Sequence, residues 1–474
     1  MSKRNPIAWT TREILEATGG ELLCGDPDRS FAGISIDSRS ITPEDFFMAI
    51  IGESHDGHGF APAVVDQGIR GLVIGRQKAD SLPMAAWQKG GINCIAVDDT
   101  TRALGDLAAF NRRRADVTVA AITGSNGKTT TRKLTAGVAV RQFKTLATAG
   151  NYNNQIGLPL TLLGLEPDHQ VAVVEMGTNN PGEIARLAEI ALPDIGVLTN
   201  IGPAHLEGLG SLEGVRREKG DLIKGLNHGG KAVLNADDTR VLQLVEETQH
   251  EVLLYGRSPE ADIRAEKIKE DDRSTSFLLV LKQEHIAVEL KVPGHYMVSN
   301  ALAAAAVGFL LNMPATEIKT GLESFTPVSG RMNICHLANG VHLIDDTYNA
   351  NPDSMKAALA TLNQMRSTDR GIFVAGDMLE LGARAPELHG QLGALASGSR
   401  IDRLCASGEY ATDVRAGALE QGMKSTDIVT GSRQEIIEDL KGFLQPGDWV
   451  LIKGSRGMAM EVVVNGLKHW AGEI

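Results

Sequence analysis

The sequence is poor in cysteine. Its four cysteines, Cys24, Cys94, Cys335 and Cys405, are scattered over 474 residues, and no two of them form a Cys-x-x-Cys pair. This spacing indicates neither a zinc site nor a disulfide framework. We therefore expect buried thiols in a reducing cytoplasm.

The sequence also lacks an excess of basic residues and a long apolar run. Its formal net charge of -12 argues against general affinity for nucleic acid or for an anionic membrane, although a local basic pocket remains compatible with it. The longest apolar stretch, 301–311, is shorter than the roughly 18 residues that span a bilayer. No apolar signal segment follows the basic N-terminus. We expect a cytoplasmic protein with no membrane insertion and no nucleic-acid partner.

The length and the order of the apolar runs predict an α/β protein of three domains. At about 150 residues per domain, a chain of 474 residues gives roughly three. Strand, turn and helix patterns repeat after residue 117 and again after residue 343, which is typical of parallel sheets flanked by helices. The predicted units are a small N-terminal α/β domain (1–115), a central P-loop ATPase-type domain with a parallel sheet (116–326) and a C-terminal Rossmann-like domain (327–474).

The stretch VTVAAITGSNGKTTT at 117–131 predicts a phosphate-binding loop. Its first half suits a buried strand and its end suits a helix, so the glycines lie in the turn between them. Backbone N–H groups of such a turn and the positive end of the helix dipole attract an anion. A lysine adds charge and a threonine hydroxyl can bind Mg²⁺, although residue 122 is isoleucine, where the strict pattern G-x-x-x-x-G-K-[ST] has glycine. The expected nucleotide contacts here are Gly124, Ser125, Asn126, Gly127, Lys128, Thr129 and Thr130.

Two further residues follow strands of the same predicted sheet. Glu175 ends the apolar run 171–174, and His205 lies in the loop after the run 195–199. Ligands of such sheets bind at the carboxyl ends of the strands. We interpret Glu175 as a Mg²⁺ ligand beside nucleotide phosphates rather than as a carboxylate at a helix N-terminus. His205 fits a ligand and a hydrogen-bonded structural residue equally well.

Other polar segments are interpreted from their positions. The turns 37–39 and 57–60 fit surface turns and ligand contacts equally well. The arginines at 112–114 suggest a solvated helix end, and the alternating residues within 262–292 suggest a small antiparallel appendage. Three polar loops are expected to close over the nucleotide from the opposite side, at 345–352, 376–380 and 453–457.

Characteristic short segments, each different from the others, are distributed along nearly the whole chain. They are TGSNGKTTT (123–131), GNYNNQIGLP (150–159), EMG (175–177), NIGPAHLEGLGS (200–211), REKGD (217–221), NADD (235–238), SNALAA (299–304), SGRMN (329–333), DDTYNANPDSM (345–355), GDMLELG (376–382) and KGSRGMAME (453–461). Together they resemble the Mur ligase family. Within the family, the serine of the loop and the block DDTYNANPDSM resemble the corresponding segments of the member that uses D-alanyl-D-alanine.

The resemblance implies an ATP-dependent amide ligase that uses ATP and Mg²⁺. Such an enzyme joins D-alanyl-D-alanine to UDP-N-acetylmuramoyl-tripeptide: the tripeptide carboxylate attacks the γ-phosphate of ATP, and the dipeptide amine then displaces phosphate from the acyl phosphate. The charges that meet in this reaction require cations, as the loop lysine and Mg²⁺ provide. The reaction belongs to cytoplasmic peptidoglycan synthesis, on which cell shape and division depend, and we expect a monomer.

The resemblance also implies roles for individual residues. The catalytic residues would be Lys128, Glu175, His205 and Lys219, of which Glu175 with Thr129 would bind one Mg²⁺ and His205 with a carbamylated Lys219 a second. Further ATP contacts would be Asn300, Arg331 and Asp345. Substrate contacts would be Asp37, Ser38, Arg39, His58, Asn153 and Asn154. One departure leaves the contacts to the nucleotide base open: the chain reads His295-Tyr296-Met297 where relatives carry Arg-His-Asn.

Two other functions remain open from the sequence. One is a different acid–amine ligase of the same superfamily, such as a folylpolyglutamate synthase, against which the N-terminal segments DSR and DGHGF argue. The other is a non-catalytic P-loop protein in which nucleotide acts as a switch. Phosphate release that depends on both substrates distinguishes the ligase from these alternatives.

Overall fold

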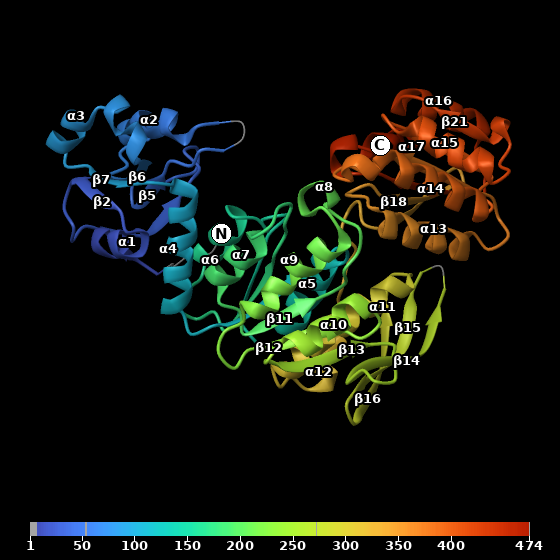
Figure 1. Cartoon of the computed structure of the whole chain (residues 1–474), viewed down its shortest axis with the longest axis horizontal. Coiled ribbons are helices and arrows are strands. Elements are labelled where there is room, and N and C mark those ends of the chain that lie inside the picture. Colours follow the sequence, from blue (N-terminus) through green and yellow to red (C-terminus); the bar gives the residue numbers. More distant parts are fainter. Residues whose placement is uncertain (1–6, 53–54, 272, 474) are drawn as a thin grey trace.

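The computed structural model describes residues 7–52, 55–271 and 273–473. Three bodies follow one another along the longest axis of the molecule, in the order of the sequence (Figure 1). Each of the first and last bodies has one main sheet, and the middle body has a nine-stranded sheet. The prediction of an α/β fold is therefore confirmed, while the domain boundaries remain predictions.

The N-terminal body has a five-stranded sheet of order β2-β7-β6-β5-β4, in which only β2 runs antiparallel to its neighbour. The expected strand at 31–36 is divided, because Phe31 pairs with Trp9 in a separate two-stranded sheet while Gly33 begins a strand of the main sheet. The elements are β1 (Trp9–Thr10), α1 (Thr11–Thr18), β2 (Glu21–Cys24), β3 (Ser30–Phe31), β4 (Gly33–Ser35), β5 (Asp45–Met48), α2 (Ala61–Asp66), β6 (Gly71–Gly75), α3 (Met84–Lys89), β7 (Asn93–Val97) and α4 (Thr100–Arg114).

The end of α4 differs from its prediction as a solvated helix end. Arg112 is buried, and its guanidinium donates to the carbonyl of Ala191 at 3.0 Å and to the carboxylate of Asp194 at 2.9 Å. A buried arginine needs such acceptors because its charge has lost water. Arg112 therefore fastens the N-terminal body to the central one.

The central sheet has the order β16-β15-β14-β13-β12-β11-β8-β10-β9, and its strands from β9 to β14 run parallel. The expected antiparallel appendage exists as β15 and β16, but β14 joins it to the main sheet, so it is an extension of that sheet. The strands are β8 (Thr118–Thr123), β9 (Thr145–Ala147), β10 (Val171–Glu175), β11 (Ile195–Leu198), β12 (Lys231–Asn235), β13 (Glu251–Gly256), β14 (Ile263–Glu270), β15 (Thr275–Leu281) and β16 (Glu284–Leu290).

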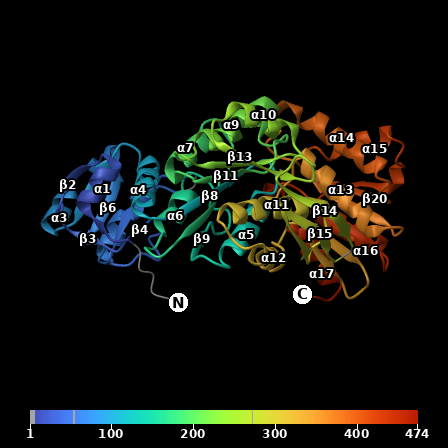
Figure 2. The same ribbon diagram turned by 90° about the horizontal axis from the view of Figure 1, so that it is seen from below.

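Helices cover both faces of the central sheet (Figure 2). One face packs on α5, α11 and α12, and the other on α7, α9 and α10. The strands β8, β10 and β11 in the middle of the sheet are accordingly buried along almost their whole length, as expected for a parallel sheet covered on both faces, whereas β14 and β16 also carry exposed residues. The helices are α5 (Lys128–Ala139), α6 (Gly157–Leu163), α7 (Glu183–Ala191), α8 (Leu206–Leu209), α9 (Leu212–Lys224), α10 (Thr239–Glu247), α11 (His295–Leu310) and α12 (Ala315–Glu323).

The C-terminal body has a six-stranded sheet of order β17-β18-β22-β19-β20-β21, parallel except for the edge strand β17. One apolar core continues from the central body into this one, so the two bodies are packed together. The elements are β17 (Asn333–His336), β18 (His342–Asp346), α13 (Pro352–Arg366), β19 (Gly371–Gly376), α14 (Ala385–Gly398), β20 (Arg403–Ser407), α15 (Ala411–Glu420), β21 (Ile428–Thr430), α16 (Arg433–Phe443), β22 (Trp449–Lys453) and α17 (Glu461–Trp470). Across the described ranges, no helix has the length and apolar character needed to cross a bilayer.

Candidate active site

The site forms at one edge of the central sheet. Strand β8 lies between β10 and β11 and runs parallel to both. The carboxyl ends of the three strands therefore meet, and they bring together the glycine-rich loop after β8, Glu175 at the end of β10 and Asn200 just after β11. This is the edge at which ligands bind in open α/β sheets.

Two glycines give the loop its path. Gly124 has φ 149° and Gly127 has φ 80°, a region of the backbone map that favours glycine. A Cβ atom on Gly124 would lie 1.9 Å from the hydroxyl of Thr199, and one on Gly127 would lie 2.4 Å from the side-chain oxygen of Asn300. Helix α5 begins directly after Gly127 without a side-chain cap. The first N–H groups of α5 can therefore donate to an anion.

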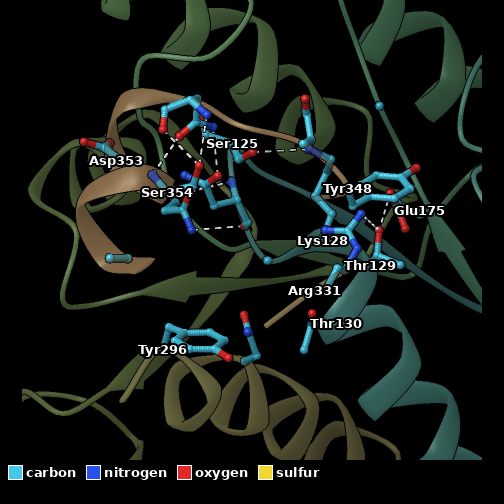
Figure 3. A pocket seen from close by; sticks show the side chains of 18 of the residues that line it. Ser125, Lys128, Thr129, Thr130, Glu175, Tyr296, Arg331, Tyr348, Asp353 and Ser354 are labelled. Atoms are coloured by element: carbon cyan, nitrogen blue, oxygen red, sulfur yellow. Dashed lines mark hydrogen bonds between the residues drawn. The ribbon is translucent and has the colours of Figure 1, made fainter. Parts of the chain in front are cut away.

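A large cavity of about 800 Å³ surrounds this loop (Figure 3). Its walls come from the central body, from the segment 327–332, from the end of β18 with the loop and helix after it, and from Lys453 at the end of β22. Seen from close by, Lys128, Thr129 and Arg331 lie together, while Tyr296 lies apart from them in the first turn of α11. The cavity has room for a nucleotide and part of a second substrate.

Lys128 is the first residue of α5, and its ammonium reaches back to the loop, where it donates to the carbonyls of Gly124 at 2.8 Å and Ser125 at 3.4 Å. Burial lowers the pKa of Lys128, and Glu175 partly opposes this effect. A lysine desolvated in this way gains most from an anion that replaces the water it has lost. The position suits a phosphate.

Glu175 is buried and receives three hydrogen bonds. They come from the hydroxyl of Thr129 at 3.1 Å, the amide of Asn153 at 2.9 Å and the guanidinium of Arg132 at 3.2 Å. A carboxylate has about four acceptor positions, so one remains for a cation beside Thr129. Arg132 was not foreseen from the sequence; its place one helical turn after Lys128 in α5 is the only signal for it.

His205 and Lys219 lie near Lys128. The Nδ1 atom of His205 contacts Glu380 of the C-terminal body at 2.5 Å, which leaves the Nε2 atom for a ligand. Burial lowers the pKa of His205, and Lys128 and Lys219 lower it further. The contact with Glu380 was not predicted, because no local pattern links residues 175 positions apart.

Lys219 has no hydrogen-bond partner for its amine among the described residues, although its side chain is completely buried. Burial and the charge of Lys128 lower its pKa well below the ordinary value. A buried amine without a partner is rare, because it carries the full penalty of desolvation. Lys219 lies on α9, and its side chain is turned away from solvent.

Arg331 and Asn300 reach the same loop from other elements. The guanidinium of Arg331 donates to Thr129 at 3.0 Å and lies 4.0 Å from the ring centre of Tyr348. Asn300 accepts a hydrogen bond from Thr131 at 3.2 Å. Both residues line the cavity, as do Asn153 and Asn154, which were expected to contact substrate.

Asp345 differs from its prediction as a nucleotide contact. Its carboxylate accepts hydrogen bonds from the backbone and the hydroxyl of Thr347, and the residue does not line the cavity. Asp346 lines it instead and forms an ion pair of 2.6 Å with the buried Lys453. Neighbouring strand residues point to opposite faces, so a shift of one position exchanges them. Knowing the register of β18 would have shown which of the two aspartates faces the cavity.

The N-terminal residues expected to contact substrate lie outside this cavity. Asp37 and Arg39 pair with each other through two contacts of 2.9 Å in an exposed turn, and Ser38 lies between them. His58 is buried; its Nδ1 contacts Asp56 at 2.6 Å and its Nε2 accepts from the backbone of Gly75 at 2.8 Å. Both ring nitrogens of His58 already have partners, so neither is free to bind a ligand as predicted.

Comparisons with known proteins give the family. Profiles described as "Mur ligase family, catalytic domain", "Mur ligase middle domain" and "Mur ligase, glutamate ligase domain" match residues 30–112, 122–308 and 330–456. The chain is 35% identical over 467 residues to the UDP-N-acetylmuramoyl-tripeptide–D-alanyl-D-alanine ligase of Escherichia coli (strain K12), with 98% of this chain and 99% of that protein covered.

Solved structures are similar over the same extent. A structure of MurF from Acinetobacter baumannii has a TM-score of 0.89 at 32% identity and covers 98% of this chain and 100% of that one. A MurF ligase from Thermotoga maritima in complex with ADP has a TM-score of 0.81 at 27% identity and covers 93% and 98%. Since both the sequence and the fold agree along almost the whole length, the chain belongs to the Mur ligase family.

Proposed function

We propose that this chain is an ATP-dependent ligase that joins D-alanyl-D-alanine to UDP-N-acetylmuramoyl-tripeptide in peptidoglycan precursor synthesis. The observation that carries the proposal is the convergence of Lys128, Glu175 and His205 on one cavity between two bodies of the chain, with the buried Lys219 close enough to influence the charges of Lys128 and His205. The relative from Escherichia coli is named for this activity.

The first step forms an acyl phosphate. An oxygen of the tripeptide carboxylate attacks the γ-phosphorus of ATP, the bond to the bridging oxygen breaks, and ADP leaves. Two anions must approach each other, so the step needs cations at the phosphates. Lys128, Arg331 and the N–H groups at the start of α5 supply positive charge there.

The residues around Glu175 fit a Mg²⁺ ion. Thr129 and Glu175 offer adjacent oxygens, and one acceptor position of Glu175 remains open. A second ion would be held by His205 and Lys219. As an ammonium Lys219 would repel a cation, but as a carbamate it becomes an oxygen ligand, and its amine without a partner favours that modification. Bound Mg²⁺ neutralises phosphate charge.

The second step forms the amide bond. The amine of D-alanyl-D-alanine attacks the acyl carbon, the tetrahedral intermediate expels inorganic phosphate, and the nitrogen loses a proton. Packing of the C-terminal body over the phosphate loop keeps water from the acyl phosphate. In the same proposal Asn300, Asp346 and Tyr348 bind the nucleotide, with Asp346 in the place first given to Asp345.

The N-terminal body is proposed to bind the UDP part of the substrate through Asp37, Ser38 and Arg39. We retain the domain division 1–115, 116–326 and 327–474, because the five-, nine- and six-stranded sheets each lie within one of these ranges. We also propose a cytoplasmic monomer, as expected from the sequence.

Phosphate release measures this function directly. With Mg²⁺ and ATP, we expect release only when both the muramoyl tripeptide nucleotide and D-alanyl-D-alanine are present, together with a product of the summed mass. ATP turnover at the same rate without either substrate would instead support a nucleotide switch. Activity with a folate acceptor in place of the muramoyl nucleotide would support another ligase of the superfamily.

A further inference from the structure

A second cavity of about 110 Å³ adjoins the phosphate loop. It shares part of its wall with the large cavity: Ser125, Lys128, His205, Asn349, Ala350 and Asn351. The rest of its wall comes mainly from two loops of the C-terminal body, 379–381 and 455–457. The small cavity therefore adjoins Ser125 and Lys128 on the side of the C-terminal body.

Glu380 in the first of these loops is held in an unusual conformation. Its backbone φ angle is 63°, a value that residues other than glycine rarely adopt. Its carbonyl accepts from the backbone of Glu207 at 3.0 Å, and the preceding residue, Leu379, donates to the hydroxyl of Ser455 at 2.9 Å. Strained backbone persists where the surroundings fix it, often at functional sites.

The Glu380 carboxylate has one oxygen in use. Oε2 contacts His205, and within the described residues no hydrogen bond to Oε1 is formed. The side chain is 47% exposed, and Glu380 lines the small cavity. A carboxylate oxygen placed here can accept from an ammonium group beside the acyl phosphate.

Arg456 in the second loop supplies the opposite charge. Its side chain is 67% exposed and has one ion pair, with Glu461 at 3.3 Å. A guanidinium has five N–H donors in a flat fork that matches a carboxylate. Most of these donors therefore remain available at the cavity that Glu380 also lines.

We propose that Glu380 and Arg456 recognise the two charges of the dipeptide acceptor, its ammonium and its carboxylate respectively. This inference rests on the proposed ligase function and adds the residues that select a zwitterionic acceptor. At 110 Å³ the cavity holds roughly ten water-sized groups, which suits a small dipeptide and excludes a nucleotide.

Acceptor kinetics test the role of Arg456. The ratio of kcat/KM for D-alanyl-D-alanine to that for its C-terminal amide measures recognition of the carboxylate. We expect wild type to prefer the acid about tenfold or more, R456A to reduce this ratio to near one, and R456K to restore part of it. R384A is the matched control, because Arg384 is an exposed arginine of the same body that pairs with Glu387 outside both cavities. An unchanged ratio in R456A would overturn the assignment.

The role of Glu380 is tested with the two half-reactions separated. We expect E380Q to raise the KM for D-alanyl-D-alanine on the order of 10- to 100-fold, while acyl phosphate formation from ATP and the tripeptide nucleotide, trapped by borohydride, continues. The control E387Q should leave both unchanged. If E380Q slows trapping and leaves that KM unchanged, Glu380 only positions His205 and the inference is wrong. If wild type forms no trapped acyl phosphate, the proposed function itself fails.

Discussion

The predicted site residues at the central cavity and those in the N-terminal body differ in whether their polar groups have hydrogen-bond partners within the protein. At the cavity, the start of α5 has no side-chain cap, and beside it the amine of the buried Lys219 has no hydrogen-bond partner among the residues that the structure describes. In the N-terminal body, both ring nitrogens of His58 are engaged and Arg39 pairs with Asp37. Buried polar groups are normally satisfied. Within the predicted site, a buried group without a partner therefore points to contact with a ligand or to modification.

The same contrast separates two buried lysines at the site. Lys453 donates to Asp346 at 2.6 Å and to the carbonyl of Asn349 at 2.8 Å, and so ties β22 to the loop after β18. Lys219 is at least as buried and donates to nothing among the described residues. We infer that the paired Lys453 has a structural role and that the unpaired Lys219 is the one open to modification. Variants at these contrasting positions should therefore affect different measurements.

The largest expected effect follows Lys128→Ala. Loss of the ammonium from the phosphate loop should lower kcat/KM for ligation at least about 10³-fold. The melting temperature should not fall, because the substitution removes a desolvated charge. Initial rates and thermal unfolding measure the two quantities. K144A removes an exposed lysine of the same body and should leave both unchanged. Near-normal ligation by K128A would contradict the phosphate role.

The next effect is expected for Lys219→Met. An apolar side chain of similar length replaces a buried amine without a partner, so stability should be equal or higher. Ligation should fall about 10²-fold, since the carbamate cannot form. Intact mass in bicarbonate buffer should show one added carbon dioxide on wild type and none on K219M. A variant that is less stable and fully active would show a purely structural lysine.

These contrasts also define what the sequence could predict. The strand–loop–helix order of 117–131 and the position of Glu175 at a strand end are local patterns, and the sheet order then brings them together. The choice between Asp345 and Asp346 depends on the register of β18, which local pattern does not determine. Arg112 and the pair of His205 with Glu380 depend on how separate bodies pack, so neither could be predicted.

A smaller effect, of a different kind, is expected for His58→Ala. The substitution leaves the backbone N–H of Gly75 without its acceptor inside a buried region, which should reduce the free energy of unfolding by about 1–3 kcal/mol. Denaturant unfolding measures this loss. His228 lies in an exposed turn, and H228A should change stability by less than about 0.5 kcal/mol. Unchanged stability with a raised KM for the muramoyl nucleotide would return His58 to a ligand role.

The smallest effect is expected for Arg39→Ala, and it tests whether a satisfied pair can still serve a ligand. The Arg39 side chain is 87% exposed, and contacts from Arg39 hold the pKa of Asp37 at about 2, so the pair is ionised at neutral pH. Exposed pairs contribute little to folding, and thermal unfolding should be unchanged. If uridine diphosphate binds here, the KM for the muramoyl nucleotide should rise a few-fold at constant kcat, since one charge-assisted contact is lost. R12A removes a comparable exposed pair with Asp28 and should leave that KM unchanged. Equal KM values for both variants would mean that paired groups in this body are structural throughout, and that the uridine site lies elsewhere.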